Sequence, residues 1–240
     1  MNVEQSWFSE RVGEWVTLVR WGDRGVPVLV FPTAGGDAWE IERRGLVGSL
    51  WPLIEAGRIK VYSVDSISGR SWLRSDDPRH SMWLQNRFDE CIRWEVVPAI
   101  RADCGSDTIE IVGAGASIGA FWAVEVICRH PDVFRLAIGM SGTYDLSGWL
   151  FGHWSDDFYF SSPIDFVPGL DGEALDRLRS RYVVLASGSG DWEDPEESWR
   201  MAAALGSKGV PNRVDIWSSD HPHDWPTWQQ MLPLYLDDLV

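Results

Sequence analysis

The sequence predicts a three-layer α/β/α sandwich built on a mostly parallel central sheet. Apolar runs of strand length alternate with helical patterns almost from end to end of the 240 residues. The runs are short and rich in β-branched residues, as expected of parallel strands buried on both faces. Strands separated by helices need crossover connections, which make neighbouring strands parallel. A hydrophobic fraction of 45% is enough for a sizeable core, and we expect a single domain over residues 1–240.

In the first half of the chain, apolar runs and turn residues define three strands and two helices. The turn is the WGDRG segment at 21–25. Apolar residues recur near helical spacing between positions 79 and 102. The predicted elements are strands at 12–20, 28–31 and 59–64, and helices at 40–56 and 79–102.

In the second half, a nearly all-apolar helix at 118–129 ends at His130, because the residue before Pro131 is driven out of the helical region. Residues 144–180 break the alternation, since they are rich in Asp, Gly, Pro and aromatic residues. We expect a small irregular insertion there, with a short helix near 173–180. The other predicted elements are strands at 108–112, 136–139, 182–186 and 213–217, and helices at 194–207 and from about 225.

Composition excludes several classes of partner. The chain carries 36 acidic against 21 basic residues and a net charge of −15, which argues against nucleic acid and against anionic membranes. No apolar run approaches the ~18 residues of a membrane span, and the N-terminus lacks the pattern of a secretion signal. Three cysteines without CxxC spacing indicate neither a disulfide scaffold nor a zinc site, so we expect a reduced, cytoplasmic location.

The segment TIEIVGAGASIG at 108–119 carries the clearest chemical signal. A strand leads into Gly-Ala-Ser-Ile-Gly and an apolar helix follows at once, which is the G-x-S-x-G nucleophile elbow. Such a turn lifts the Ser117 hydroxyl above the sheet, and it directs the Ile118 N–H at the position of an oxyanion. The alternative is a dinucleotide-binding fingerprint, but Ile118 stands where G-x-G-x-x-G needs glycine.

A serine nucleophile needs a histidine base, and the chain has five histidines. Only His221 and His223 lie between the last predicted strand and the last helix, where this arrangement delivers its base. We predict His223 as the base, with His221 as the alternative.

The third member of a catalytic triad is an acid that orients the histidine base. Asp191 follows the strand at 182–186 and is our prediction. Asp194 competes with it, although the following Pro195 favours a helix N-cap at Asp194. Asp145, after the strand at 136–139, is a further alternative.

A second oxyanion donor is expected from the small residues that follow the strand at 28–31. The loop reads PTAGG, and its paired glycines suit a backbone that approaches a substrate closely. We assign the Ala34 N–H to this role, with Thr33 as second choice; a plain tight turn is the alternative.

Five segments together resemble a known family: VLVFPTAGG, GASIGAFWA, RHPDVF, SGTYDLSGWL and HDWPTW. They resemble the putative-esterase family of α/β-hydrolases, which is related to esterase D, feruloyl esterases and the antigen 85 mycolyltransferases. The most similar members are bacterial proteins with FPTxGG, GASFGA, Gly-x-x-Asp-Trp and GHDWPxW segments. The resemblance runs from about residue 7 to 235.

The resemblance implies an α/β-hydrolase fold and a carboxylic-ester hydrolase without a metal or other cofactor. Ser117 matches the family nucleophile, Asp191 the aspartate of Gly-x-x-Asp, and His223 the histidine of HDWPxW. The chain departs from the family at two places. It reads HPHDW, which brings His221 near the base, and it has Ile118 where the family tends to have Phe.

These observations predict a Ser-His-Asp esterase that acts on a small-molecule ester through an acyl-enzyme. An acyltransferase with the same triad and a non-catalytic binding or assembly protein are the alternatives. Exposed aromatic patches often mark interfaces, so a homo-oligomer is compatible with the sequence. Of the sixteen tryptophans, we expect five to surround the active site because they fall on its loops: Trp39, Trp149, Trp154, Trp192 and Trp225.

Overall fold

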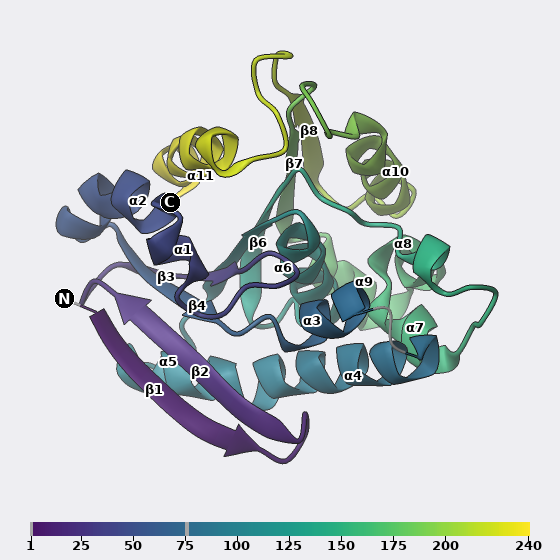
Figure 1. Ribbon diagram of the computed structural model, residues 1–240, viewed down its shortest axis with the longest axis horizontal. Helices are drawn as coiled ribbons and strands as arrows, with labels where there is room; N and C mark the ends of the chain where they lie inside the picture. The colour runs from purple at the N-terminus through teal and green to yellow at the C-terminus, as the bar shows by residue number, and fades with distance from the viewer. Residues whose placement is uncertain (1, 75–76) are drawn as a thin grey trace.

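A single mixed sheet of eight strands runs through the computed structural model, which describes residues 2–74 and 77–240 (Figure 1). Its strand order is β1-β2-β4-β3-β5-β6-β7-β8. The β1–β2 and β2–β4 pairs are antiparallel, and every later pair is parallel. The strands are β1 (Asn2–Ser9), β2 (Glu14–Trp21), β3 (Val26–Phe31), β4 (Ile59–Val64), β5 (Ile111–Ala116), β6 (Phe134–Met140), β7 (Tyr182–Ser187) and β8 (Asn212–Ile216).

Helices cover both faces of this sheet and bury two separate apolar layers. One face carries α1 (Glu40–Arg43), α2 (Leu46–Glu55) and α11 (Trp225–Leu239), as Figure 1 shows. The other carries α3 (Ile67–Arg74), α4 (Pro78–Cys91), α5 (Val97–Asp103), α6 (Ile118–Arg129) and α10 (Pro195–Gly206). The predicted three-layer sandwich is therefore confirmed. No helix among the described residues is both long enough and apolar enough to cross a membrane.

Most predicted elements agree with the observed ones, although α3 was not predicted and the strand expected at 108–112 is shifted to Ile111–Ala116. The strand at 59–64 and the helix at 118–129 have the predicted bounds. The helix expected at 40–56 is divided, because Gly45 adopts a φ of +78° between α1 and α2. The sequence did not indicate β1, since its side chains are almost all exposed at the sheet edge and carry no apolar alternation.

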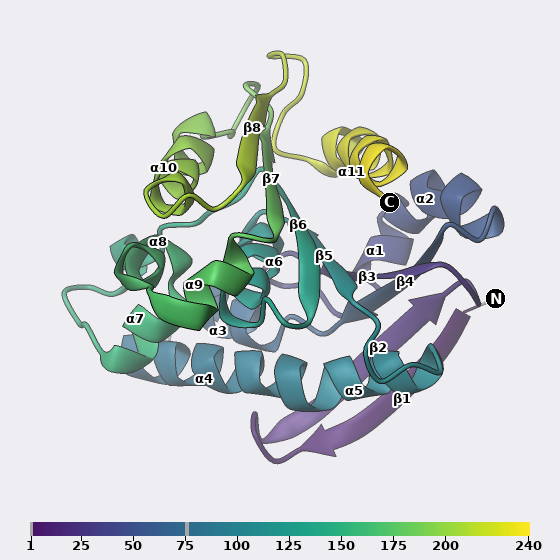
Figure 2. The ribbon, with the colours of Figure 1, turned by 180° about the vertical axis from the view of Figure 1, so that it is seen from behind.

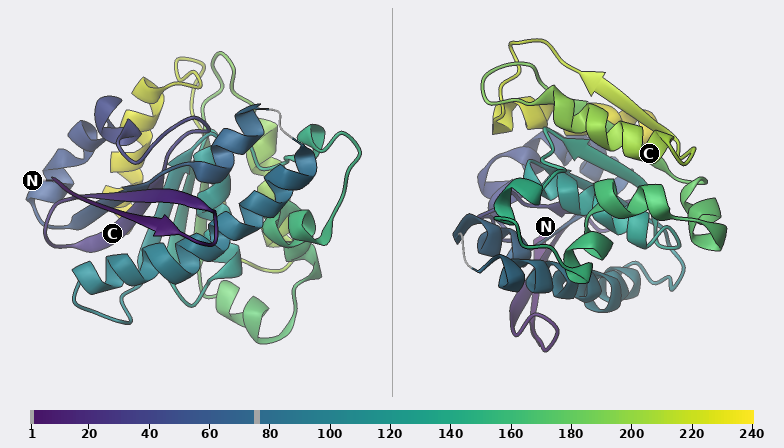
Figure 3. Two further views of the ribbon diagram at one scale, coloured as in Figure 1. Left: turned by 60° about the horizontal axis from the view of Figure 1, so that its bottom comes forward. Right: turned by 90° about the vertical axis from the view of Figure 1, so that its right-hand side faces the viewer.

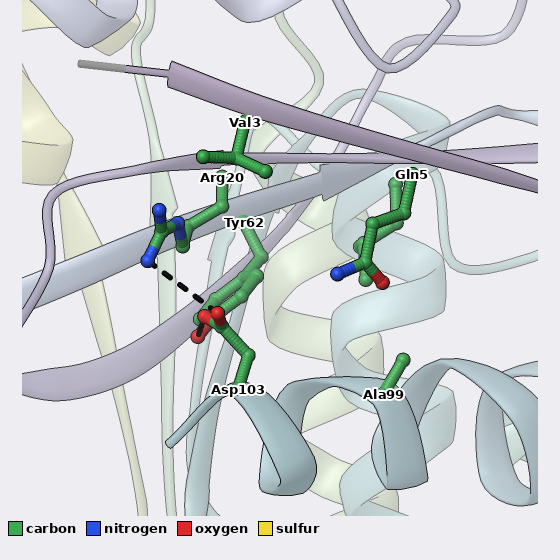
Figure 4. Close-up of a pocket in the computed structure, with 7 residues that line it drawn as sticks. Val3, Gln5, Arg20, Tyr62, Ala99 and Asp103 are labelled. Atoms are coloured by element: carbon green, nitrogen blue, oxygen red, sulfur yellow. Dashed lines mark hydrogen bonds and ion pairs between the residues drawn. The ribbon is translucent and has the colours of Figure 1, made fainter.

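The α4 and α5 helices join through a π-helical segment (Ile92–Val96) into one continuous rod, which Figure 2 shows beside the β1–β2 hairpin. Behind the hairpin, Asp103 receives a hydrogen bond from the Tyr62 hydroxyl at 2.6 Å and pairs with Lys60 at 2.6 Å and Arg20 at 3.4 Å. The pocket beside this cluster has a volume of about 10 Å³, room for about one water (Figure 4). These contacts fasten the hairpin to the rod.

The 144–180 insertion is more regular than predicted. It contains three short helices, α7 (Asp156–Ser161), α8 (Pro163–Phe166) and α9 (Gly172–Leu178). One 3₁₀ turn (Ser147–Trp149) precedes α7, and another (Val167–Gly169) lies between α8 and α9. Of the three helices, α9 matches the predicted helix. The insertion packs on α4 (Figure 3), where Gln85 donates to the Ser161 hydroxyl at 2.8 Å and Asn86 to Asp157 at 3.0 Å.

Candidate active site

The loops that carry the predicted site all follow the carboxyl ends of parallel strands. Ser117 follows β5 directly and has φ 57° and ψ −126°, a conformation that residues other than glycine rarely adopt. Its N–H donates to the Met140 carbonyl at 2.9 Å, and its own carbonyl accepts from the Thr143 N–H at 3.4 Å. Ser117 is thus a sharp strand–helix elbow at the head of α6, fastened to the end of β6.

The glycines on either side of Ser117 have a steric reason. A β-carbon on Gly119 would lie 2.4 Å from the Phe31 carbonyl oxygen and 2.7 Å from that of Pro32. A β-carbon on Gly115 would lie 2.2 Å from the carbonyl oxygen of Gly119 itself. The elbow therefore requires glycine at both positions, because α6, β5 and the end of β3 approach one another with no room for a side chain.

A cavity of about 190 Å³ opens beside Ser117. Residues from the β3 loop, α3, the elbow and the start of the insertion line it: Ala34, Trp72, Leu73, Ser117, Ile118, Thr143, Leu146 and Trp149. The proposed nucleophile and both predicted oxyanion donors therefore share one cavity.

The loop after β3 is held by Glu40, a residue that the sequence analysis missed. Glu40 is buried, and its carboxylate accepts hydrogen bonds from the Thr33 N–H and the Thr33 hydroxyl, both at 2.8 Å. The Thr33 N–H is therefore engaged. Within residues 2–74 and 77–240, no protein group accepts a hydrogen bond from the Ala34 N–H. The Ile118 N–H has no partner within its helix because Ile118 is the first residue of α6.

His223 faces Glu193 rather than Asp191. Its Nδ1 lies 3.6 Å from Glu193 Oε2, and the glutamate side chain is only 1% exposed. The imidazole packs edge-on against Trp228, with ring centroids 5.2 Å apart. Asp191 contributes its backbone carbonyl, which accepts from the His223 N–H at 3.0 Å. This bond joins the loop after β7 to the loop after β8, which lie side by side beyond the sheet in Figures 1 and 2.

Two hydroxyls hold the Glu193 carboxylate. Ser141 donates to Oε1 at 2.5 Å, and Ser187 lies 3.1 Å from Oε2. Trp228 in turn donates its Nε1–H to the Ser141 hydroxyl oxygen at 2.9 Å. Burial by itself raises the pKa of Glu193, but His223, Ser141 and Ser187 outweigh burial and hold that pKa below its ordinary value. The carboxylate is therefore ionised at neutral pH.

The three predicted acids have other positions. The Asp191 side chain is exposed. Asp194 caps α10 and accepts from the Glu196 N–H at 3.2 Å, as its alternative interpretation predicts. Asp145 pairs with Arg200 at 3.2 Å.

His221, the alternative base, turns toward its own loop. Its Nδ1 lies 3.0 Å from the Ser218 hydroxyl, and its ring packs against Trp217 at 4.9 Å. Its carbonyl accepts from the Gly190 N–H at 3.2 Å. His221 therefore joins the two loops, and the histidine that faces the buried carboxylate is His223.

Of the five tryptophans expected around the site, Trp149 lines the cavity. Trp39 donates to Glu4 at 2.7 Å, Trp225 packs on Trp228, and Trp154 packs on Phe158. Trp192 is 92% exposed. The cavity also has Trp72 in its wall, which was not predicted because it follows a strand whose loop carried no catalytic motif.

Two missed residues had a sequence signal. The acid in this chain order is either Asp or Glu, and Glu193 stands in the predicted loop two residues after Asp191. Trp228 closes the HDWPTW segment. Ser141 and Glu40 had no such signal, because only the folded chain brings them to the site.

Comparisons with known proteins identify a family and support the fold. The family described as "Putative esterase" matches residues 64–239. A ferulic acid esterase has a TM-score of 0.74 at 17% identity, over 98% of this chain and 96% of its own. An S-formylglutathione hydrolase from Agrobacterium tumefaciens has a TM-score of 0.73 at 14% identity, over 99% of this chain and 92% of its own. MPT51 of Mycobacterium tuberculosis has a TM-score of 0.70 at 16% identity, over 100% of this chain and 97% of its own. The predicted α/β-hydrolase fold is thus confirmed. No curated protein matches the chain.

Proposed function

Because the chain belongs to the Putative esterase family, we propose that it hydrolyses small-molecule carboxylic esters through Ser117, His223 and Glu193. Glu193 replaces Asp191 of the sequence prediction as the orienting acid. The Ile118 and Ala34 N–H groups form the oxyanion hole. Support comes above all from one observation: the buried carboxylate of Glu193 faces His223, at the carboxyl-end edge of the parallel strands, which also carries the serine elbow. Despite burial, the hydrogen bonds and the neighbouring imidazole hold the pKa of Glu193 below its ordinary value.

In this mechanism His223 takes the proton of Ser117 while the serine oxygen attacks the ester carbonyl. The tetrahedral oxyanion accepts hydrogen bonds from the two backbone N–H groups. His223 then gives the proton to the departing alcohol, which leaves an acyl-enzyme. A water activated by His223 releases the acid. Glu193 holds the imidazole in the tautomer with the proton on Nδ1 and stabilises its cation.

Ser117→Ala tests the proposal directly. We expect hydrolysis of p-nitrophenyl acetate to fall by about 10³-fold or more, as when a triad is broken. A fluorophosphonate probe should label the wild type on Ser117 and leave the variant unlabelled. Ser180→Ala is the matched control, because Ser180 is an exposed serine before β7, at the opposite end of that strand from Glu193. Wild-type turnover in Ser117→Ala would overturn the proposal, and unlabelled folded wild type would point to a non-catalytic binding protein.

A further inference from the structure

The cavity beside Ser117 has a composition and a size that define one part of the substrate. We propose that it binds the acyl group of the ester, and that this group is compact and uncharged: a short aliphatic chain or a single ring. This inference rests on the proposed function of Ser117.

The lining of the cavity is apolar. Trp72, Leu73, Ile118, Leu146 and Trp149 form most of it, with hydroxyls only from Ser117 and Thr143. No charged side chain lines it among the residues that the structure describes. A carboxylate or ammonium on the bound group would lose its hydration without gaining an ion pair from the cavity wall, so its binding would be unfavourable.

The indole of Trp72 offers a ring surface rather than a hydrogen bond. The Nε1–H of Trp72 is already donated to Gln85 Oε1 at 2.9 Å, so this indole has no free donor for a ligand. Leu146 is fully buried and closes the cavity from within, whereas Leu73 and Trp149 are 62% and 43% exposed and stand at its mouth.

The position of the histidine decides which half of the ester lies here. His223 must reach the leaving oxygen to protonate it, so the alcohol part lies on the side of the loop after β8. No residue of that loop lines the cavity in the described chain, whereas both proposed oxyanion donors do. A carbonyl held by Ile118 and Ala34 therefore directs its acyl substituent into the cavity.

The volume limits the size of this substituent. An apolar cavity of roughly 150 Å³ binds benzene, and drug-sized ligands occupy about 300–1,000 Å³. At about 190 Å³ the cavity matches one ring or a chain of about six carbons. Each methylene that enters it should improve kcat/KM by about fourfold until the cavity is full.

The experiment compares kcat/KM for p-nitrophenyl acetate, butanoate, pentanoate, hexanoate, decanoate and benzoate, together with the mono-p-nitrophenyl ester of succinic acid. We expect a rise to an optimum near hexanoate, with benzoate also accepted, and a fall at decanoate. The anionic succinyl ester should be at least about 100-fold poorer than its pentanoyl counterpart. Decanoate as the best substrate, or a succinyl ester equal to pentanoate, would overturn the proposal.

Variants link the optimum to the cavity. Trp149→Ala opens the mouth and Leu146→Ala removes the inner wall, so each should move the optimum toward longer chains. Trp154→Ala is the control, because this exposed tryptophan belongs to the same insertion but does not line the cavity. An unchanged chain profile in Trp149→Ala counts against the proposal, even if Leu146→Ala does not fold. Fluorophosphonate labelling of Ser117 separates the outcomes: labelled enzyme with another profile refutes only the acyl site, whereas no labelling and no hydrolysis of any ester refutes the proposed function as well.

Discussion

Replacing Glu193 by glutamine tests the carboxylate that faces His223 without changing its shape. In the wild type, Oε1 accepts from Ser141, whose oxygen already accepts from Trp228, while Oε2 lies near Ser187 and His223. A glutamine must place its amide nitrogen at one of these positions. The Ser187 side is favoured, because that hydroxyl can donate to the Gly188 carbonyl at 2.9 Å and accept from the amide.

This orientation directs an N–H of the amide toward Nδ1 of His223. The imidazole must then carry its proton on Nε2, and in that tautomer it cannot accept a proton from Ser117. The comparable Asp→Asn change in a serine protease triad lowers kcat by about 10⁴ through the same tautomer error. We expect a loss of this size in Glu193→Gln, equivalent to about 5 kcal/mol of transition-state stabilisation.

The assay is kcat/KM for p-nitrophenyl acetate, with urea unfolding of the same preparations to confirm that the variant folds. Asp191→Asn is the matched control, and since its side chain is exposed we expect activity within about twofold of wild type. The reasoning fails if Asp191→Asn loses activity by several orders of magnitude while Glu193→Gln keeps most of it.

A series of unfolding measurements at different pH values gives a second readout for Glu193→Gln. Because the folded-state pKa of Glu193 is depressed, its contribution to stability is present at neutral pH and is lost as pH falls through that folded value. Wild type should therefore lose more stability than Glu193→Gln on acidification.

Three further substitutions test other parts of the argument. Gly119→Ala places a β-carbon 2.4 Å from a carbonyl oxygen at the end of β3, so urea unfolding should show a loss of about 1–3 kcal/mol, whereas Gly148→Ala, which meets open space, should stay near wild type. Burial, with a neighbouring carboxylate, raises the pKa of Glu125 well above its ordinary value of 4.5, so the folded state keeps a proton that the unfolded chain releases as pH rises. The contribution of Glu125 to stability should fall by about 1.4 kcal/mol per pH unit above 4.5 until its folded pKa is passed, and Glu125→Gln should remove this contribution from the pH dependence of denaturation curves. Trp228→Phe keeps a ring against His223 but loses the hydrogen bond to Ser141, so kcat/KM should fall about fivefold, whereas a fall as large as that of Glu193→Gln would contradict a positioning role.

The sequence predicted the frame of the molecule because strong local signals and the global fold agree there. The helix at 118–129 begins at the elbow and ends before Pro131, so sterics alone define its bounds. The strand at 59–64 is fully buried, and four of its six residues are apolar or aromatic, with Lys60 and Ser63 between them. The side-chain pattern of β1 does not predict a strand. This exposed edge segment is extended because it pairs with β2, not because of its own side chains.

The acid shows where sequence reasoning reaches its limit. Asp191 and Glu193 lie in one loop, and no pattern in the chain says which of them turns inward. Trp192 between them adopts a φ of +66°, and the Glu193 N–H donates to the Gly190 carbonyl at 3.2 Å. This turn leaves the Asp191 side chain in solvent and buries the carboxylate of Glu193. The outcome depends on a single backbone conformation that residue types do not specify.

The HDWPTW ending is a single structural unit once the loop after β8 is folded. Asp224 caps α11 and accepts from the Trp225 N–H at 2.7 Å, and Pro226 occupies the first turn, where its missing donor has no consequence. One turn later, Trp228 reaches back under His223 and donates to Ser141, which donates to Glu193. The start of α11 therefore sets the distance between His223, the proposed base, and the Trp228 indole, which is hydrogen-bonded to Ser141 beside Glu193. The HDWPTW motif combines the N-cap of α11 with the base of the proposed triad. The spacing between His223 and Trp228 is therefore as important to the site as His223 itself.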